Sequence, residues 1–331
     1  MKFKEIDIRP SDLMKLKEPA LEHDKQFLLA RKDEFIKVNC PACCSDDHSE
    51  WAIKDNFDYT ICNQCNTVFM NPRANELLLA DFYKQSKNYE FWNKYIFPAS
   101  DEIRKERIFK PRAQKVIDFC NKHEINGTIL EVGAAYGTFC EAIKGFNYFQ
   151  RIIAVEPTPD LAETCRKKDL EVFQEPIENV KLPNDSIDVV VSFEVMEHLF
   201  NPKDFILNCT SMLKKGGLFI CTCPSIDGLG TLVLKEKAKV IDHEHLNYFS
   251  PSSLALLFQD CSLEIVEVST PGELDVDLLK NAFLENPEDF SDQQFISKIL
   301  SSEEENIRNN FQDFLKKNLL SSHLWIIGRK K

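Results

Sequence analysis

The sequence lacks the features that mark membrane-spanning, secreted and polyanion-binding chains. No run of residues comes near the roughly 18 consecutive apolar residues that a membrane-spanning helix requires. The first residues, MKFKEIDIRPSD, contain no apolar core of a secretory signal. The net charge is -12 and there is no long block of lysine and arginine, which disfavours nucleic acid as a partner. These absences predict a cytoplasmic protein without membrane insertion.

What is present is an ordinary globular composition, 43% hydrophobic and 28% charged, over 331 residues. At about 150 residues per domain, this length allows two domains. The twelve cysteines fall into two classes, and five of them cluster between residues 40 and 65. The others are scattered through apolar segments, where reduced and buried thiols are expected. They are Cys120, Cys140, Cys165, Cys209, Cys221, Cys223 and Cys261.

Two C-x2-C pairs stand in the cluster: Cys40 with Cys43, and Cys62 with Cys65. Each pair can present two sulfurs to one tetrahedral ion, and the separation of the pairs matches a four-thiolate zinc site. Residues 51–61 alternate enough to form the strands of a zinc ribbon. Four thiolates leave zinc no open position, so the predicted site is structural and stabilises a module too small to fold alone. Cys44 adjoins a ligand and is interpreted as a bystander.

The predicted organisation has four parts: an N-terminal helical segment at 1–35 with no legible chemistry, a zinc ribbon at 36–75, an aromatic-rich helical linker or lid at 76–126, and an α/β domain at 127–331. The aromatic side chains of the third part could cover a substrate or simply pack between modules. They are Phe82, Tyr83, Tyr89, Phe91, Trp92, Tyr95 and Phe97.

From residue 127 strands and helices alternate, which predicts a doubly wound parallel sheet covered on both faces. Strands are expected at 128–132, 151–156, 170–173, 187–192, 217–222, 262–268 and 323–328. Helices are expected at 103–122, 138–144, 159–168, 202–214 and 251–260. Residues 271–320 are expected to form a mostly helical insertion before the last strand.

The stretch TILEVGAAYGTFCEAIKG, from 128 to 145, organises the α/β domain. A buried strand leads into a turn from Gly133 to Gly137, and glycine there lets a ligand lie against the backbone. A nicotinamide site would show G-x-G-x-x-G, followed by an acid about twenty residues later. Here the strand carries Glu131 just before the turn. Glu156 closes the next strand, where it could take both hydroxyls of a ribose.

Four motifs occur in order: E-x-G-x-x-x-G, the strand end AVE, SIDVVVSFEVMEHL and LKKGGLFICTCP. Together they resemble the class I S-adenosylmethionine-dependent methyltransferases over roughly residues 127–270. The family has E/D-x-G-x-G-x-G, so Ala135 departs from its central glycine. Alanine is small enough for the turn to survive, with slightly less room at the cofactor's amino-acid tail. The fold that this implies is a Rossmann-like methyltransferase sheet.

The resemblance implies that S-adenosylmethionine is the cofactor, and an acidic cleft suits its cationic sulfur and amine. Near the adenine the correspondence is loose, because EPIEN lacks the usual Gly-Asp or Asp-Ala. The implied binding residues are Glu131, Gly133, Ala135 and Gly137 at the methionine part, Glu156 and the adjoining Pro157 at the ribose, Pro176 and Ile177 near the adenine, and Phe193 and Glu194 near the sulfonium.

A hydroxyl, or a carbon beside a carbonyl, must lose a proton before it accepts a methyl group, which calls for a base. The string E-H-x-x-Y-F-S follows the fifth strand. With the zinc ribbon, it is similar to deoxysugar C-methyltransferases and to methyltransferases of surface-polysaccharide biosynthesis. That resemblance implies that Glu244, His245 and His198 face the acceptor, and Tyr248 is a further catalytic candidate. A structural role remains open for His198, and more so for His243.

The predicted function is methylation of a small molecule, a nucleotide-linked sugar or polysaccharide precursor, at carbon or oxygen with a His/Glu base. One alternative is an RNA base methyltransferase that uses the ribbon for recognition. Lys54 is the only basic residue between Cys40 and Cys65, too little charge to track phosphates. The other alternative is a non-catalytic cofactor-binding protein. Ala135 leaves that possibility open, and the other residues of the glycine turn oppose it.

Overall fold

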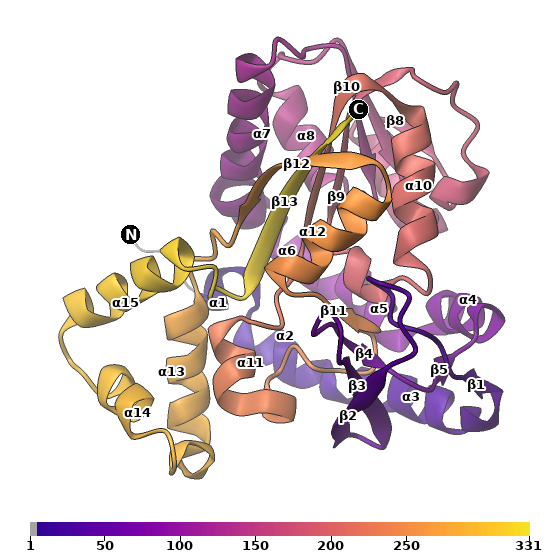
Figure 1. Cartoon of the computed structure of the whole chain (residues 1–331). Helices are drawn as coiled ribbons and strands as arrows, with labels where there is room; N and C mark the ends of the chain where they lie inside the picture. Colours follow the sequence, from indigo (N-terminus) through magenta and orange to yellow (C-terminus); the bar gives the residue numbers. More distant parts are fainter. Residues whose placement is uncertain (1–4) are drawn as a thin grey trace.

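The computed structural model describes residues 5–331 and is built around a seven-stranded sheet in the order β12-β13-β10-β9-β6-β7-β8 (Figure 1). Neighbouring strands from β10 to β8 run parallel, whereas β13 is antiparallel to both of its neighbours. The predicted doubly wound α/β fold is confirmed. The strands are β6 (Thr128–Val132), β7 (Arg151–Val155), β8 (Glu171–Phe173), β9 (Ile187–Phe193), β10 (Leu213–Pro224), β12 (Leu263–Ser269) and β13 (His323–Lys330).

Alternation along the strands sorts apolar side chains between the two faces of the sheet. Ile129 and Val189 pack on one face against α7 (Lys110–Lys122) and α8 (Thr138–Lys144). Their neighbours in sequence, such as Leu130, pack on the other face. The helices that cover that face are α10 (Pro202–Met212) and α12 (Pro251–Asp260). On the α8 side, α9 (Pro159–Lys167) completes the cover.

The order of the strands reverses beside β6, where β7 and β9 flank it. In open α/β sheets, ligands bind beyond the carboxyl ends of the strands at such a switch point. The glycine turn follows β6 directly. The fold therefore places this turn at the position where a cofactor is expected.

The predicted ribbon strands form a four-stranded sheet in the order β11-β4-β3-β2. Its outer strand β11 comes from the predicted acceptor loop, and Tyr248 of that strand faces Val68 of β4. The ribbon and the acceptor loop thus share one sheet. The strands are β2 (His48–Lys54), β3 (Phe57–Cys62), β4 (Val68–Met70) and β11 (Asn247–Tyr248), and a separate pair joins β1 (Phe35–Ile36) to β5 (Arg73–Ala74).

The remaining helices gather with the ribbon at the edge where the parallel strands end, below the sheet in Figure 1. The predicted helix at 103–122 is not regular, because a π turn, η3, interrupts it. The N-terminal elements are α1 (Glu5–Ile8), α2 (Ser11–Leu16), α3 (Glu18–Leu29) and η1 (Lys32–Glu34). The elements that we call the cap are α4 (Glu76–Gln85), α5 (Lys87–Phe91), η2 (Trp92–Ile96), α6 (Phe97–Arg104) and η3 (Lys105–Phe109).

The predicted helical insertion before the last strand is present, and α11 packs against it. These helices and the short turns of the domain are α11 (Leu229–Leu234), α13 (Asp275–Glu285), α14 (Gln294–Leu300), α15 (Glu305–Lys317), η4 (Ile177–Asn179), η5 (Met196–His198), η6 (Lys235–Lys237) and η7 (Pro287–Phe290). Within residues 5–331, no helix combines the length and apolarity needed to cross a membrane.

Candidate active site

The glycine turn after β6 needs its two glycines for both conformation and space. Gly133 and Gly137 have φ values of +80° and +72°, which side chains rarely adopt. A Cβ on Gly133 would lie 2.5 Å from Val195 Cγ2, and one on Gly137 would lie 2.9 Å from Cys165 Sγ. Ala135 also has a positive φ, of 46°. The turn keeps its shape without the central glycine, at a conformational cost of about 1–2 kcal/mol.

Two buried carboxylates flank this turn. Burial raises the pKa of Glu131 to about 8, and its Oε2 has no hydrogen-bond partner within residues 5–331. In Glu156, Oε2 accepts from the Ala135 amide at 2.7 Å and Oε1 accepts from the Thr158 amide at 2.8 Å. Each oxygen of Glu156 keeps a second lone pair for a ligand hydroxyl. The unpartnered oxygen and the glycine-lined turn fit a cationic, ribose-bearing cofactor.

At the end of β9, Phe193 is buried, and its ring centroid lies 4.7 Å from that of Phe139. Glu194 follows with a φ of 55° and exposes 43% of its side chain, while its Oε1 accepts from Thr222 Oγ1 at 2.6 Å. Of the other implied cofactor residues, Pro157 and Pro176 are exposed. Ile177 is buried in the main core.

The structure brings His198 and His245 together, with ring centroids 4.7 Å apart. The Nδ1 of His198 lies 3.0 Å from the Glu244 carbonyl oxygen, and the Nδ1 of His245 lies 2.8 Å from the Val240 carbonyl oxygen. A carbonyl can only accept, so we assign the hydrogen to Nδ1 in both rings and a lone pair to each Nε2. Side-chain atoms of Glu197 and the two histidines all lie within 4.8 Å of one another.

The two histidines have opposite pKa shifts. Burial lowers the pKa of His198 to about 3, and the charge of His245 adds to this, so His198 stays neutral. Burial also lowers the pKa of His245, but the negative charges of Asp242 and Glu197 outweigh burial and raise it overall. Burial and Asp242 raise the pKa of Glu244 to about 7. Of the two imidazoles, His245 is the one that can hold a proton.

A frame of backbone hydrogen bonds holds this loop. Asp242 Oδ1 accepts from the amides of Glu244 and His245, at 2.9 and 3.1 Å. The Tyr248 hydroxyl accepts from the Asp242 amide at 3.0 Å and is buried with its ring. His243 is also buried, with its ring 6.1 Å from that of Phe57. Tyr248 and His243 are therefore buried supports of this loop.

The cap contributes groups that sequence reasoning missed. Asn88 of α5 donates from its side chain to the Glu244 carboxylate, and the Tyr83 hydroxyl donates to the His198 carbonyl at 3.1 Å. The buried carboxylate of Asp24 accepts from the Asn88 amide at 3.0 Å, which ties α5 to α3. Only the density of aromatic residues around Tyr83 marked this segment in the sequence. Nothing in the sequence marked Asn88.

The four cysteines of the two C-x2-C pairs converge, and their sulfurs lie within 4.8 Å of one another. Cys40 and Cys65 are 3.5 Å apart at sulfur, as are Cys43 and Cys62. A tetrahedral zinc with Zn–S bonds of about 2.3 Å separates its sulfurs by about 3.8 Å. The donor set is compatible with zinc. Cys44 is exposed on the loop.

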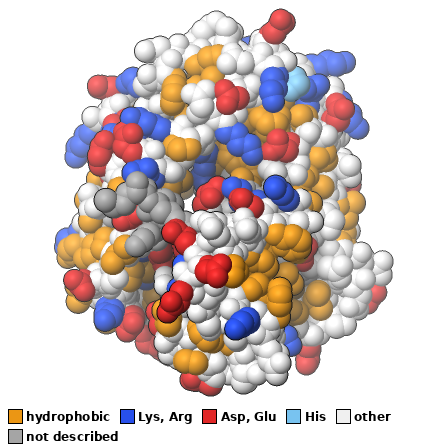
Figure 2. All heavy atoms as spheres, turned by 90° about the vertical axis from the view of Figure 1, so that its left-hand side faces the viewer, with side chains coloured by type: hydrophobic (Ala, Val, Ile, Leu, Met, Phe, Trp, Pro, Cys, Tyr) orange, Lys and Arg blue, Asp and Glu red, His pale blue; other side chains and the backbone are white. Residues whose placement is uncertain are grey.

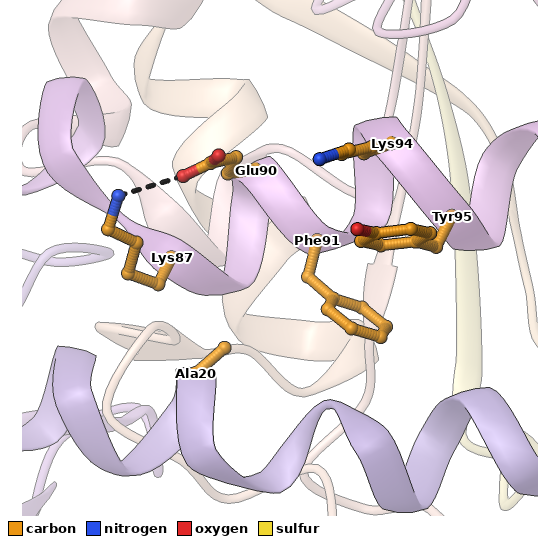
Figure 3. Close-up of a pocket in the computed structure, with 6 residues that line it drawn as sticks. All are labelled: Ala20, Lys87, Glu90, Phe91, Lys94 and Tyr95. Carbon is orange, nitrogen blue, oxygen red and sulfur yellow. Dashed lines mark hydrogen bonds and ion pairs between the residues drawn. The ribbon is translucent and has the colours of Figure 1, made fainter.

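A pocket of about 210 Å³ lies between α3 and α5 (Figure 3). It is distinct from the histidine cluster, none of whose residues line it. Its charges are already engaged: Lys87 pairs with Glu90 at 2.9 Å, and the Lys94 amine lies 5.2 Å from the Tyr95 ring. The pocket is therefore a feature of the outer surface of the cap.

A family model described as a methyltransferase domain matches residues 102–268, half of the chain. The chain belongs to the S-adenosylmethionine-dependent methyltransferases. The match spans α7, the glycine turn and every strand of the sheet up to β12. The glycine turn and its two carboxylates therefore lie within the matched methyltransferase domain.

The curated relatives of this methyltransferase include a ubiquinone biosynthesis O-methyltransferase of Rickettsia akari, 29% identical over 57% of this chain and 79% of the relative. One of the same name from Xanthomonas campestris is 27% identical over 43% of this chain and 64% of the relative. A chain of the Haloferax volcanii complex between the Trm112 methyltransferase activator and a methyltransferase shares the fold, with a TM-score of 0.50. Its identity is 16%, over 73% of this chain and 96% of that chain.

Proposed function

We propose that this methyltransferase methylates a carbon or oxygen of a nucleotide-linked sugar or related polysaccharide precursor, with His245 as the base. The observation that carries the proposal is the facing pair of His198 and His245. Both rings fix Nδ1 on a backbone carbonyl, so both present Nε2 lone pairs, and their pKa values are shifted apart. Pairs whose surroundings separate their pKa values in this way are typical of acid–base sites.

When bound, S-adenosylmethionine supplies a methyl group on a cationic sulfur. His245 Nε2 would take the proton from the acceptor hydroxyl, or from the carbon beside a carbonyl. The freed electron pair would displace the sulfur, so that the methyl–sulfur bond would break as the new bond forms and neutral S-adenosylhomocysteine would leave. Asp242 and Glu197 stabilise the imidazolium that results. The neutral His198 accepts a hydrogen bond from the acceptor. Glu244, held by Asn88, orients a sugar hydroxyl.

On the donor side, Glu156 holds the ribose hydroxyls and Glu131 faces the methionine part of the cofactor. Phe193 and Glu194 flank the sulfonium. The main task of these residues is to hold the methyl group against the acceptor and to exclude water. We place Tyr248 as a positioning residue, because its hydroxyl is bonded to the loop backbone.

The zinc that we assign to Cys40, Cys43, Cys62 and Cys65 is structural. Its ribbon supplies β4, which pairs with β11 of the acceptor loop. The Tyr59 hydroxyl of the ribbon donates to the Asp242 carbonyl at 2.8 Å. Zinc bound to the ribbon would thus stabilise the frame that positions His245.

The alternatives differ in their acceptor. The relatives named as ubiquinone biosynthesis O-methyltransferases favour oxygen of a small molecule over a macromolecule. The ribbon offers little positive charge to the phosphates of an RNA acceptor, because the amine of Lys54 is already engaged and donates to the Ala238 carbonyl at 2.9 Å. A small molecule is therefore the acceptor class that we favour.

The test is a screen of nucleotide sugars for transfer of a labelled methyl group. With the best substrate, His245→Ala should lower turnover by about a thousandfold, the contribution typical of a general base. Calorimetry should show unchanged cofactor binding in this variant. His23→Ala, which removes a half-exposed imidazole on α3, serves as the control. Full activity in His245→Ala would overturn the role of the base, and uptake by phenols or RNA alone would overturn the acceptor class.

A further inference from the structure

The N-terminal helices and the cap bring four basic side chains to the edge of the active site. Arg9 follows α1, Lys17 lies between α2 and α3, Arg104 ends α6, and Arg112 lies in the first turn of α7. We call these four residues the cationic wall. The side chain of Arg112 is 11% exposed and that of Arg9 is 45% exposed, while Lys17 and Arg104 are half-buried. The wall therefore runs from the interior of the site to its rim.

Aromatic rings hold the wall in place. The Lys17 amine lies 5.4 Å from the Trp92 ring, and that ring lies 5.4 Å from Phe97. The Arg104 guanidinium is 5.7 Å from Phe97 and 5.9 Å from Phe109. These distances fall within the range of cation–π contacts, which position a cation without neutralising it.

The inner end of the wall adjoins the donor site. The Arg112 guanidinium lies 4.5 Å from the Phe193 ring and 4.0 Å from the Glu194 carboxylate. The Phe97 ring lies 5.7 Å from Tyr136, a residue of the glycine turn. The π turns η2 and η3 flank α6, and such turns are frequent at functional sites.

The charges around the wall show what it faces. Burial lowers the pKa of Lys17, and the negative charges of Glu244 and Asp242 in the acceptor loop oppose this lowering. Burial lowers the pKa of Arg104 to about 10, and the positive charges of Arg9 and Arg112 lower it further. The negative charges of Glu194 and Asp101 raise the pKa of Arg104 and offset this lowering only in part.

Arg9 pairs with Glu5 at 3.5 Å and Arg112 lies 4.0 Å from the Glu194 carboxylate, so within residues 5–331 the positive charge without an ion-pair partner is that of Lys17 and Arg104. Half-buried charge of this kind is costly unless an anion binds.

The local positive charge of the cationic wall contrasts with the charge of the whole chain. The chain carries a net charge of -12, so an anionic molecule is repelled by most of its surface. The face shown in Figure 2 is hollowed near its middle, and basic side chains are visible inside the hollow. Helix α1 packs against α6, which brings the end of α1 near Arg104.

We propose that the cationic wall binds the phosphate or pyrophosphate of the acceptor and so turns its sugar toward His245. This inference rests on the proposed function and gives the N-terminal helices a role in it. Arginine recognises phosphate oxygens through paired N–H donors, and lysine does so as a point charge. The carboxylate of the cofactor has the same oxyanion chemistry, so the test must separate the two sources.

The experiment uses the full chain saturated with S-adenosylhomocysteine and measures inorganic pyrophosphate binding by calorimetry. Lys17→Gln and Arg104→Gln should each weaken pyrophosphate binding about tenfold or more, the loss expected for one charged hydrogen bond. Arg104→Lys should lose less affinity than Arg104→Gln, because it keeps the charge but not the paired donors. Lys94→Gln is the matched control, since Lys94 is a cap lysine resting on Tyr95 in the outer pocket (Figure 3). Thermal unfolding checks that each variant is folded.

Unchanged pyrophosphate affinity in both glutamine variants would overturn the proposal. It would also fail if Arg104→Gln weakened S-adenosylhomocysteine binding tenfold while pyrophosphate binding stayed constant, because the anion would then be the cofactor's carboxylate. The assay needs no sugar and no turnover, and His245→Ala should bind pyrophosphate like the unchanged protein. If the variants change pyrophosphate binding as expected but the protein methylates no nucleotide sugar, the result contradicts the proposed function and leaves the anion site standing.

Discussion

The donor half and the proposed acceptor half of this active site are built in different ways. The core of the donor half occupies one short stretch, from Glu131 to Glu156, and depends on the backbone of a single turn, with Phe193 and Glu194 added from the end of β9. The acceptor half is assembled from η5, the loop around β11, the ribbon and the cap. Its contact between Asn88 and Glu244 joins residues 156 positions apart. The donor half therefore depends on local sequence, and the acceptor half depends on the packing of every module.

The largest effect is expected from breaking the ribbon. Cys62→Ser removes one of four sulfurs, and the β4–β11 pairing should fail with the ribbon. We expect turnover to be lost and the free energy of unfolding to fall by about 3 kcal/mol or more, while cofactor binding survives. Metal analysis measures the zinc content, thermal unfolding measures the stability, and calorimetry measures cofactor binding. Cys44→Ser, at the exposed neighbouring thiol, should change none of them. Equal loss of cofactor binding and turnover in Cys62→Ser would show that the two halves are not separable.

The second largest effect is expected in the donor half alone. Glu156→Ala removes the carboxylate assigned to the ribose and leaves the amides of Ala135 and Thr158 without their acceptor. Cofactor affinity should fall about a hundredfold, as expected for two hydrogen bonds to a charged group. Calorimetry with S-adenosylhomocysteine measures this, and Glu163→Ala on the exposed side of α9 is the control. Unchanged affinity would refute the ribose assignment.

A smaller change tests the electrostatics of the acceptor half. As a base, His245 must be neutral, so kcat/KM should rise with pH through a pKa above its ordinary value of about 6.5. Asp242→Asn removes the charge that stabilises the imidazolium but keeps an acceptor oxygen for the loop amides. The rising limb should therefore move about one unit to lower pH. Asp292→Asn, at an exposed aspartate, should leave the profile unchanged. An unmoved limb in Asp242→Asn would contradict His245 as the base.

The same division explains what could be predicted from sequence. Strand alternation and the glycine spacing are local signals, and they predicted the sheet and the position of the turn. The proposed acceptor loop was selected through the string around Glu244, and its role stays a prediction. Its pairing with the ribbon and its bond to Asn88 were not predicted, because they join segments that are distant in the sequence. The π turn η3 was also not predicted, because its composition does not differ from that of a regular helix.

The smallest effect is expected at Ala135, the residue of the glycine turn at which this chain departs from its family. Ala135 has a φ of 46°, which costs an alanine about 1–2 kcal/mol, whereas glycine there loses about 0.5–1 kcal/mol more chain entropy on folding. Ala135→Gly should therefore stabilise the protein by about 0.5–1 kcal/mol in denaturant unfolding. The control Ala134→Gly, at a neighbour without positive φ, should destabilise it. Destabilisation by Ala135→Gly would show that the methyl group of Ala135 is a packing contact of the turn, and the family's glycine would then not be interchangeable with alanine here.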